Sequence, residues 1–79
     1  MVVKAYVLIT VETPLTQQVI DRLRQVPSAV GVNPVIGPFD VVVEVEAETY
    51  EDLTATLRND IRTIQGVRTT VTCPWSFDE

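Results

Sequence analysis

The segment VKAYVLITVETPLTQQVIDRLRQVP, which spans Val3–Pro27, decides the fold because it contains one complete strand-to-helix unit. Within Val2–Glu12, most residues at the odd positions and most at the even positions are apolar or β-branched. This pattern predicts a strand with both faces at least partly covered. Thr13 is the expected N-cap of the following helix, with Pro14 at its first position. Apolar residues then recur at helical spacing until Pro27 ends the helix.

The second half of the chain repeats this unit in a weaker form. Thr49 predicts another helix start, with Asp52 three residues later as a variant of the capping box. Gly66 is the expected stop of this helix. The strand Val67–Cys73 follows and is expected to end at Pro74.

Two further strands are expected between the helices. Ala29–Ile36 and Asp40–Ala47 have the composition of strands, and the short Gly37-Pro38 turn between them predicts an antiparallel hairpin. Pro34 removes one ladder donor and is therefore expected at a sheet edge or at a bulge.

The order of elements is thus strand, helix, strand, strand, helix, strand. Right-handed crossovers turn this order into an α+β, ferredoxin-like βαββαβ plait, a four-stranded antiparallel sheet with both helices on one face and strand order 4-1-3-2. A chain of 79 residues is expected to form a single domain, residues 1–79.

One face of this sheet has no helix to cover it. Tyr6, Leu8 and Val42 are expected to point to that face, beside Thr70 and Thr72. An apolar sheet face in contact with water is unfavourable, and a second copy of the chain is the cover that the sequence offers. We therefore expect a homodimer that associates through its sheets.

The composition argues against several classes of function. The chain has 6 Lys and Arg residues against 11 Asp and Glu residues, a net charge of −5, and no basic cluster, so direct nucleic-acid binding is not expected. The longest apolar run, Ala5–Ile9, is too short to span a membrane, and no secretion signal is visible, which favours a cytoplasmic location. With no histidine and one cysteine, the chain offers no disulfide, metal site or catalytic triad. We expect neither a cofactor nor enzymatic activity.

Two groups of side chains have both a functional and a structural interpretation. Glu44, Glu46 and Glu48 would suit cation binding or acid–base chemistry, but the favoured interpretation is a solvated strand face. Cys73 would need a base nearby to act as a nucleophile, so a small apolar residue at a strand end is the favoured interpretation.

Two segments stand out as a place for a small polar ligand, the turn Gly37-Pro38-Phe39-Asp40 and the strand that starts at Gly66-Val67. A turn rich in glycine and proline exposes backbone N–H and C=O groups. If subunits meet there, these N–H groups and the threonine hydroxyls would bind a carboxylate, and Asp40 would bind an ammonium group. From the residues alone, an ordinary β-turn beside a β-rich strand is the favoured interpretation.

The order and spacing of these motifs resemble the effector-binding module of the Lrp/AsnC family, the regulation of amino acid metabolism (RAM) domain. The resemblance covers nearly the whole chain, from the strand Ala5–Ile9 to Thr72. Its landmarks are the break at Val26-Pro27, Gly66-Val67 before Thr70-x-Thr72, and a turn whose Gly37, Phe39 and Asp40 match the family pattern Gly-x-Tyr/Phe-Asp.

In that family the module dimerises through its sheets, dimers commonly assemble into octameric rings, and amino acid effectors bind in clefts between dimers. The resemblance therefore implies an amino acid effector and a homodimer, with an octamer as the larger assembly. Carried over by motif, the effector contacts are the backbone of Gly37 and Phe39 and the side chains of Asp40, Thr70 and Thr72, with Thr69 as a further candidate.

The chain departs from full-length family members, which carry an N-terminal helix-turn-helix, because it begins directly at the first strand. We therefore expect a stand-alone sensor without direct DNA contact, with mixed assembly with a full-length Lrp/AsnC regulator as its route to transcription. The Pro74-Trp75 tail also differs from the family's usual apolar continuation. Two alternatives stay open, a small dimeric ferredoxin-like enzyme with a pocket between paired sheets and an assembly module that binds no ligand. The sequence does not name the effector.

Overall fold

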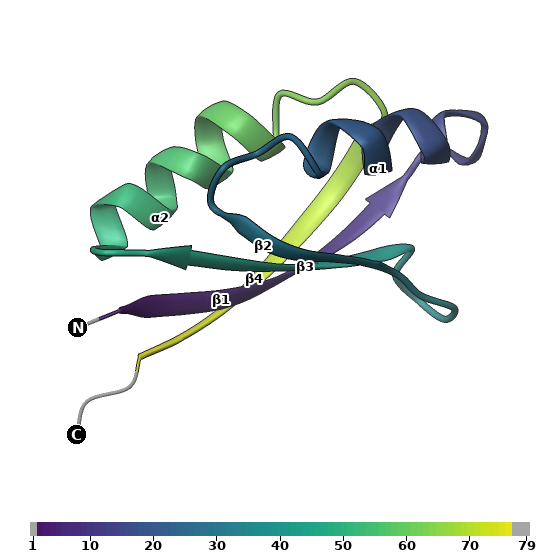
Figure 1. Ribbon diagram of the computed structural model, residues 1–79. Coiled ribbons are helices and arrows are strands. Elements are labelled where there is room, and N and C mark those ends of the chain that lie inside the picture. Colours follow the sequence, from purple (N-terminus) through teal and green to yellow (C-terminus); the bar gives the residue numbers. More distant parts are fainter. Residues whose placement is uncertain (1, 77–79) are drawn as a thin grey trace.

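The computed structural model describes residues 2–76 (Figure 1). Its elements are β1 (Val3–Val11), the 3₁₀ segment η1 (Thr13–Leu15), α1 (Thr16–Leu23), β2 (Ala29–Pro34), β3 (Val41–Ala47), α2 (Tyr50–Thr56), the π-helical segment η2 (Leu57–Ile61) and β4 (Val67–Ser76). The strands and the two helical regions occur in the predicted order. Over the described residues, no helix has the length and apolar character needed to cross a membrane.

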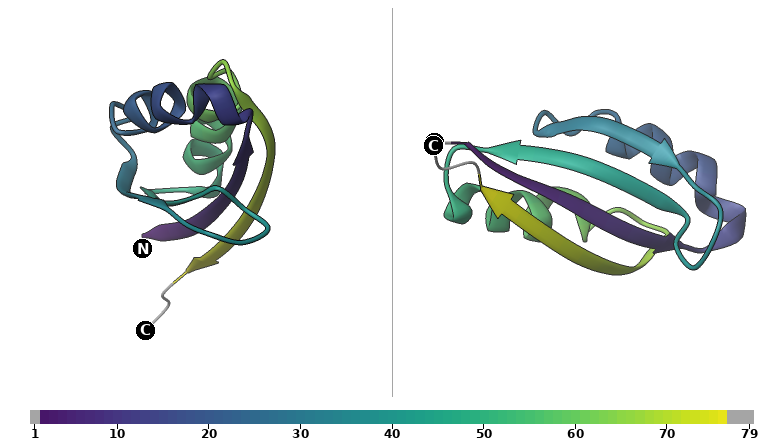
Figure 2. Two further views of the ribbon diagram at one scale, coloured as in Figure 1. Left: turned by 90° about the vertical axis from the view of Figure 1, so that its right-hand side faces the viewer. Right: turned by 90° about the horizontal axis from the view of Figure 1, so that it is seen from below.

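The four strands form one sheet in the order β2-β3-β1-β4, and all neighbouring strands pair antiparallel. This is the predicted strand order, counted from the opposite edge. Both helices lie over the same face of the sheet, as Figure 1 and Figure 2 show from three directions. The predicted α+β, ferredoxin-like plait is therefore confirmed.

The core lies between the sheet and the helices. β1 and β3 alternate in burial, because successive side chains of a strand point to opposite faces. The largest fully buried side chains come from these two strands, from α1 and from η2, and they are Ile9, Leu23, Ile61, Val3, Val7, Val19, Val41, Val43 and Val45. Burial of apolar surface stabilises a fold by about 25 cal/mol per Å², so this layer holds the sheet and the helices together.

The two predicted helix starts have different outcomes. The hydroxyl of Thr49 accepts a hydrogen bond of 3.0 Å from the backbone N–H of Asp52, which confirms the second N-cap. The first prediction was wrong, because Thr13 lies inside η1 and α1 begins at Thr16. The N–H of Leu15 donates to the carbonyl of Glu12 at 2.8 Å, so the chain first closes a tight 3₁₀ turn around the proline and only then becomes α-helical.

The end of the last strand was also predicted wrongly. β4 does not stop before Pro74 but continues to Ser76, with Pro74 opposite Ala5 and Trp75 opposite Lys4 on β1. β4 is an edge strand of the sheet. A proline is tolerated at an edge because its missing N–H falls on the unpaired side.

A bulge near the start of β4 overturns the predicted facing of its threonines. Val67 pairs with Val11 and Thr69 pairs with Thr10, so Arg68 has no opposite residue on β1. One extra residue in a strand shifts the alternation of the residues that follow. The side chains of Thr70 and Thr72 therefore share the helix-covered face with Ile9 and Val7, their partners on β1, instead of the open face.

The open face of the sheet carries a group of apolar side chains beside the charged residues Lys4, Glu44 and Glu46. Val71 of β4 lies opposite Leu8, and Val42 of β3 lies opposite Leu8 on its other side. Tyr6 and Val71 are 44% and 45% exposed. The rings of Tyr6 and Trp75 contact each other, with centroids 4.7 Å apart and planes tilted by 38°. The apolar character predicted for this face is thus present, with Val71 in place of the threonines.

Candidate functional site

The turn between β2 and β3 contains three of the predicted site residues. The backbone N–H of Val35 donates to the carbonyl of Asp40 at 3.0 Å and closes the turn. Gly37 is exposed and has φ +135°, a conformation that side-chain-bearing residues rarely adopt. Phe39 and Asp40 are half-buried. The turn therefore presents exposed backbone around Gly37 and is anchored at Asp40.

Asp40 fixes this turn to the end of β1. Its backbone N–H donates to the carbonyl of Ile9 at 2.8 Å, and its carboxylate Oδ2 accepts a 2.9 Å hydrogen bond from the N–H of Val11. One carboxylate oxygen is thus used inside the subunit. The remaining oxygen carries the charge and acceptor capacity that a bound ammonium group needs.

The threonines of β4 do not all face the same side of the sheet. The hydroxyl of Thr69 is 2.5 Å from the hydroxyl of Thr10 on the neighbouring strand, on the open face and at the end of β1 where Asp40 is attached. Thr70 faces the helix-covered side. Thr72 faces that side as well, and it lies about 10 Å further along the strand than Thr69.

The structure therefore brings together only part of the predicted site. Asp40 and Thr69 lie at the same end of the sheet, with Thr10 on the strand between them. Thr10 was missed by the sequence reasoning, because its relevance depends on the cross-strand partner and not on a local motif. Thr70 and Thr72 were predicted to contact the same ligand as Asp40. Their side chains face the helix-covered side of the sheet, so their orientation does not support that prediction.

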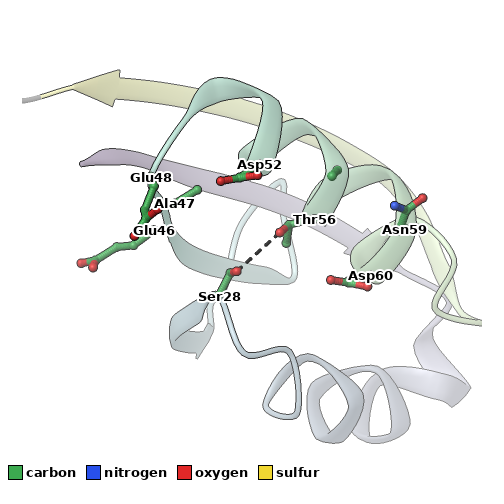
Figure 3. Close-up of a pocket in the computed structure, with 9 residues that line it drawn as sticks. Ser28, Glu46, Ala47, Glu48, Asp52, Thr56, Asn59 and Asp60 are labelled. Carbon is green, nitrogen blue, oxygen red and sulfur yellow. Dashed lines mark hydrogen bonds between the residues drawn. The ribbon is translucent and has the colours of Figure 1, made fainter. Parts of the chain in front are cut away.

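Three hollows in the described surface lie away from this turn, and none of them is lined by Gly37, Phe39, Asp40 or the threonines of β4. The first, which we call the acidic hollow and which Figure 3 shows in close-up, has a volume of about 450 Å³. Its lining residues are Ser28, Glu46, Ala47, Glu48, Asp52, Ala55, Thr56, Asn59 and Asp60. It lies where β3 passes into α2, about 20 Å along β3 from the turn.

The acidic hollow contains two of the three glutamates that the sequence singled out, Glu46 and Glu48. Glu46 forms an ion pair of 3.5 Å with Lys4, while Glu44 lies opposite Tyr6 on β1. Within residues 2–76, no group of three or more potential ligand side chains is placed to hold a metal ion.

A second hollow, which we call the interhelical groove, lies between the end of α1 and η2 and has a volume of about 390 Å³. Its lining residues are Arg22, Gln25, Val26, Pro27, Asn59, Asp60, Thr63 and Ile64. It shares Asn59 and Asp60 with the acidic hollow. No sequence motif pointed to this groove.

Comparison with known families adds to this geometry. The family model of the Lrp/AsnC ligand binding domain matches residues 4–74, almost the whole described chain. The chain belongs to this family. The resemblance inferred from the turn and the strand motifs is therefore confirmed, and the protein is a ligand-binding domain of a family of regulators. No match was found among curated proteins.

Solved structures of similar fold include both short and longer chains. A protein from Thermus thermophilus superposes with a TM-score of 0.90 at 26% identity, and the match covers 98% of this chain and 96% of that one. AsnC from E. coli superposes with a TM-score of 0.89 at 17% identity, over 96% of this chain and 52% of AsnC. A transcriptional regulator from Neisseria meningitidis, in a complex with L-Met, has a TM-score of 0.86 at 9% identity, over 96% of this chain and 51% of the regulator. The chain thus spans about half the length of these two regulators and shares their fold.

Proposed function

We propose that this Lrp/AsnC domain is an amino acid sensor whose effector binds at the turn 37–40, next to the start of β4, where two subunits meet. The observation that carries this proposal is the attachment of Asp40 to β1 by two hydrogen bonds. This attachment would hold the turn in one position for a ligand. Rigid presentation reduces the ordering cost that a ligand must offset on binding.

The chemistry of the turn suits the head group that all amino acids share. Exposed backbone N–H groups near Gly37 would donate to the effector carboxylate, and the second oxygen of Asp40 would accept from the effector ammonium. The Thr10 and Thr69 hydroxyls offer further donors at the same end of the sheet. The complex of the Neisseria meningitidis regulator with L-Met supports an amino acid as the effector class.

A second subunit is part of this proposal because the turn lines none of the three hollows described above. Exposed Tyr6 and Val71 make the open sheet face a suitable dimer interface, since association would remove their apolar surface from water. Assembly of dimers into an octamer would then place turns from different dimers side by side. Mixed assembly with a full-length regulator, in the cytoplasm, would connect effector binding to transcription.

Calorimetric titration of the whole chain with each of the twenty amino acids tests the proposal, together with the mass measured by light scattering with and without ligand. We expect saturable heat with a small subset of amino acids. We also expect a shift in assembly at saturation, because a ligand that binds between subunits favours the assembled state. An assembled protein that takes up none of the twenty would instead be an assembly module without an effector.

A further inference from the structure

The interhelical groove combines opposite charges that are not used inside the described chain. The guanidinium of Arg22, from α1, and the carboxylate of Asp60, from η2, both line this groove. They form no ion pair with each other or with another charged group of residues 2–76. A positive and a negative group in one groove are thus both available to a ligand that carries both charges.

Neutral polar groups surround these two charges. Gln25 and Asn59 contribute side-chain amides, which both donate and accept hydrogen bonds. The hydroxyl of Thr63 donates to the carbonyl of Asn59 at 2.7 Å, so its lone pairs remain for a donor on a ligand. The groove therefore offers hydrogen-bond and charge partners both for a carboxylate and for an ammonium group.

One wall of the groove is apolar. Val26, Pro27 and Ile64 line it, and Val26 and Ile64 are each 7% exposed. A volume of about 390 Å³ falls within the range of small-molecule sites, and most of the residues that line this groove are polar. An aliphatic side chain would lie on this wall while its head group faces the charges.

The backbone conformation of η2 is a second, independent observation in favour of a functional site at this groove. The N–H of Arg62 donates to the carbonyl of Leu57 at 2.9 Å, which is the wide i to i+5 hydrogen bond of a π-helix. Asn59 and Asp60 belong to this segment. π-helical turns are rare and occur frequently at functional sites.

We propose that the interhelical groove is a second amino acid site, complete within one subunit and selective for free amino acids with aliphatic side chains. The guanidinium of Arg22 binds the carboxylate, Asp60 binds the ammonium group, and Val26 with Ile64 contacts the side chain. This site does not depend on the effector site at the turn, since it is formed by other residues and needs no second subunit.

Amide chemical shifts of the ¹⁵N-labelled whole chain, titrated with L-leucine, test the proposal. We expect saturable shifts at Gln25, Asn59 and Thr63. N-acetyl-L-leucine, which lacks the ammonium group, and L-leucinamide, which lacks the carboxylate, are the matched probes. Both should bind about two- to fivefold more weakly at the groove, the range expected when one charge-assisted contact at a surface is lost.

Charge-neutralising variants identify the two contacts. Arg22→Gln should weaken L-leucine binding and remove the preference over L-leucinamide, while Asp60→Asn should remove the preference over N-acetyl-L-leucine. The controls are Arg24→Gln, at the C-cap of the same helix, and Asp52→Asn, whose side chain lines the acidic hollow and not the groove. Neither control should change binding at the groove. All four side chains are exposed, so the fold should be retained.

Two results would overturn the groove site. Chemical-shift changes confined to residues 37–40 and the start of β4 would support the effector site at the turn and would mean that L-leucine does not bind in the groove. Equal weakening of L-leucine binding by Arg22→Gln and Arg24→Gln would mean that general charge attraction, and not a specific contact with Arg22, holds the ligand. Shifts at the groove without shifts at the turn would support the groove and would mean that L-leucine is not the effector of the turn.

Discussion

The carboxylate of Asp40 accepts a 2.9 Å hydrogen bond from the backbone N–H of Val11, and this contact joins the turn between β2 and β3 to the end of β1. The backbone N–H of Asp40 donates in turn to the carbonyl of Ile9. β1 continues into Glu12, whose N–H donates to the carbonyl of Gly66 at 2.8 Å, directly before β4. A series of backbone contacts thus connects the two segments of the proposed effector site.

Asp40→Ala and Asp40→Asn should separate the structural role of this residue from ligand binding. Alanine leaves the partly buried N–H of Val11 without its acceptor and should lower the free energy of unfolding by about 1–3 kcal/mol. Asparagine keeps an acceptor oxygen, so its loss should be smaller, but it removes the charge that attracts an ammonium group. Urea unfolding at one fixed protein concentration and calorimetry measure the two effects. Wild-type amino acid affinity in Asp40→Asn would mean that Asp40 only anchors the turn.

Gly66→Ala should destabilise the fold by more than about 2 kcal/mol. Gly66 has φ +105°, and an added Cβ would lie 2.8 Å from Cγ2 of Val19 and 2.9 Å from Cβ of Leu15. Gly31→Ala is the matched control, because its Cβ would meet nothing closer than 3.6 Å, at Nδ2 of Asn33. Thermal unfolding of the two variants under identical conditions makes the comparison. Equal losses would show that the close packing at the Gly66 position is not what limits substitution.

Local patterns in the sequence were sufficient for the architecture. Alternation in β1 and β3 and the helical spacing in α1 depend on residues close together in the chain. The capping hydroxyl of Thr49 is a local signal too and was predicted correctly. Gly66 has the positive φ of a glycine turn, but it does not end the helix, because η2 already ends at Ile61 with Arg62 as its C-cap. Strand order then followed from the handedness of the crossovers. The family likewise followed from motifs along a single chain.

The parts of the site that could not be predicted depend on contacts between distant segments. The bulge at Arg68 appears only when β4 is paired with β1, and it moves Thr70 to the helix-covered face. Thr10 became a candidate site residue only through its contact with Thr69, which is 59 positions away in the sequence. The interhelical groove joins the end of α1 to η2, and the spacing of residues in one segment contains no information about the other.

Val71→Glu should convert the proposed dimer to monomers. Val71 is 45% exposed on the open face beside Leu8, so a charge there would be buried without a partner on association. Tyr50→Glu is the matched control, since Tyr50 is 53% exposed but lies on α2 in the helix layer. Sedimentation velocity over a range of protein concentrations gives the masses. If both variants keep the wild-type mass, the open face is not the interface.

Trp75 is the single tryptophan of the chain and should report the same association by fluorescence. Its ring lies against Tyr6, at a centroid distance of 4.7 Å, at the margin of the open face. Association through that face would shield the indole from water, so emission should move to longer wavelength as the protein is diluted and dissociates. Val71→Glu should emit at the dissociated wavelength at every concentration, whereas Tyr50→Glu should follow the wild type. A constant emission wavelength through a range in which the mass changes would place Trp75 outside the interface and require association through another surface of the molecule.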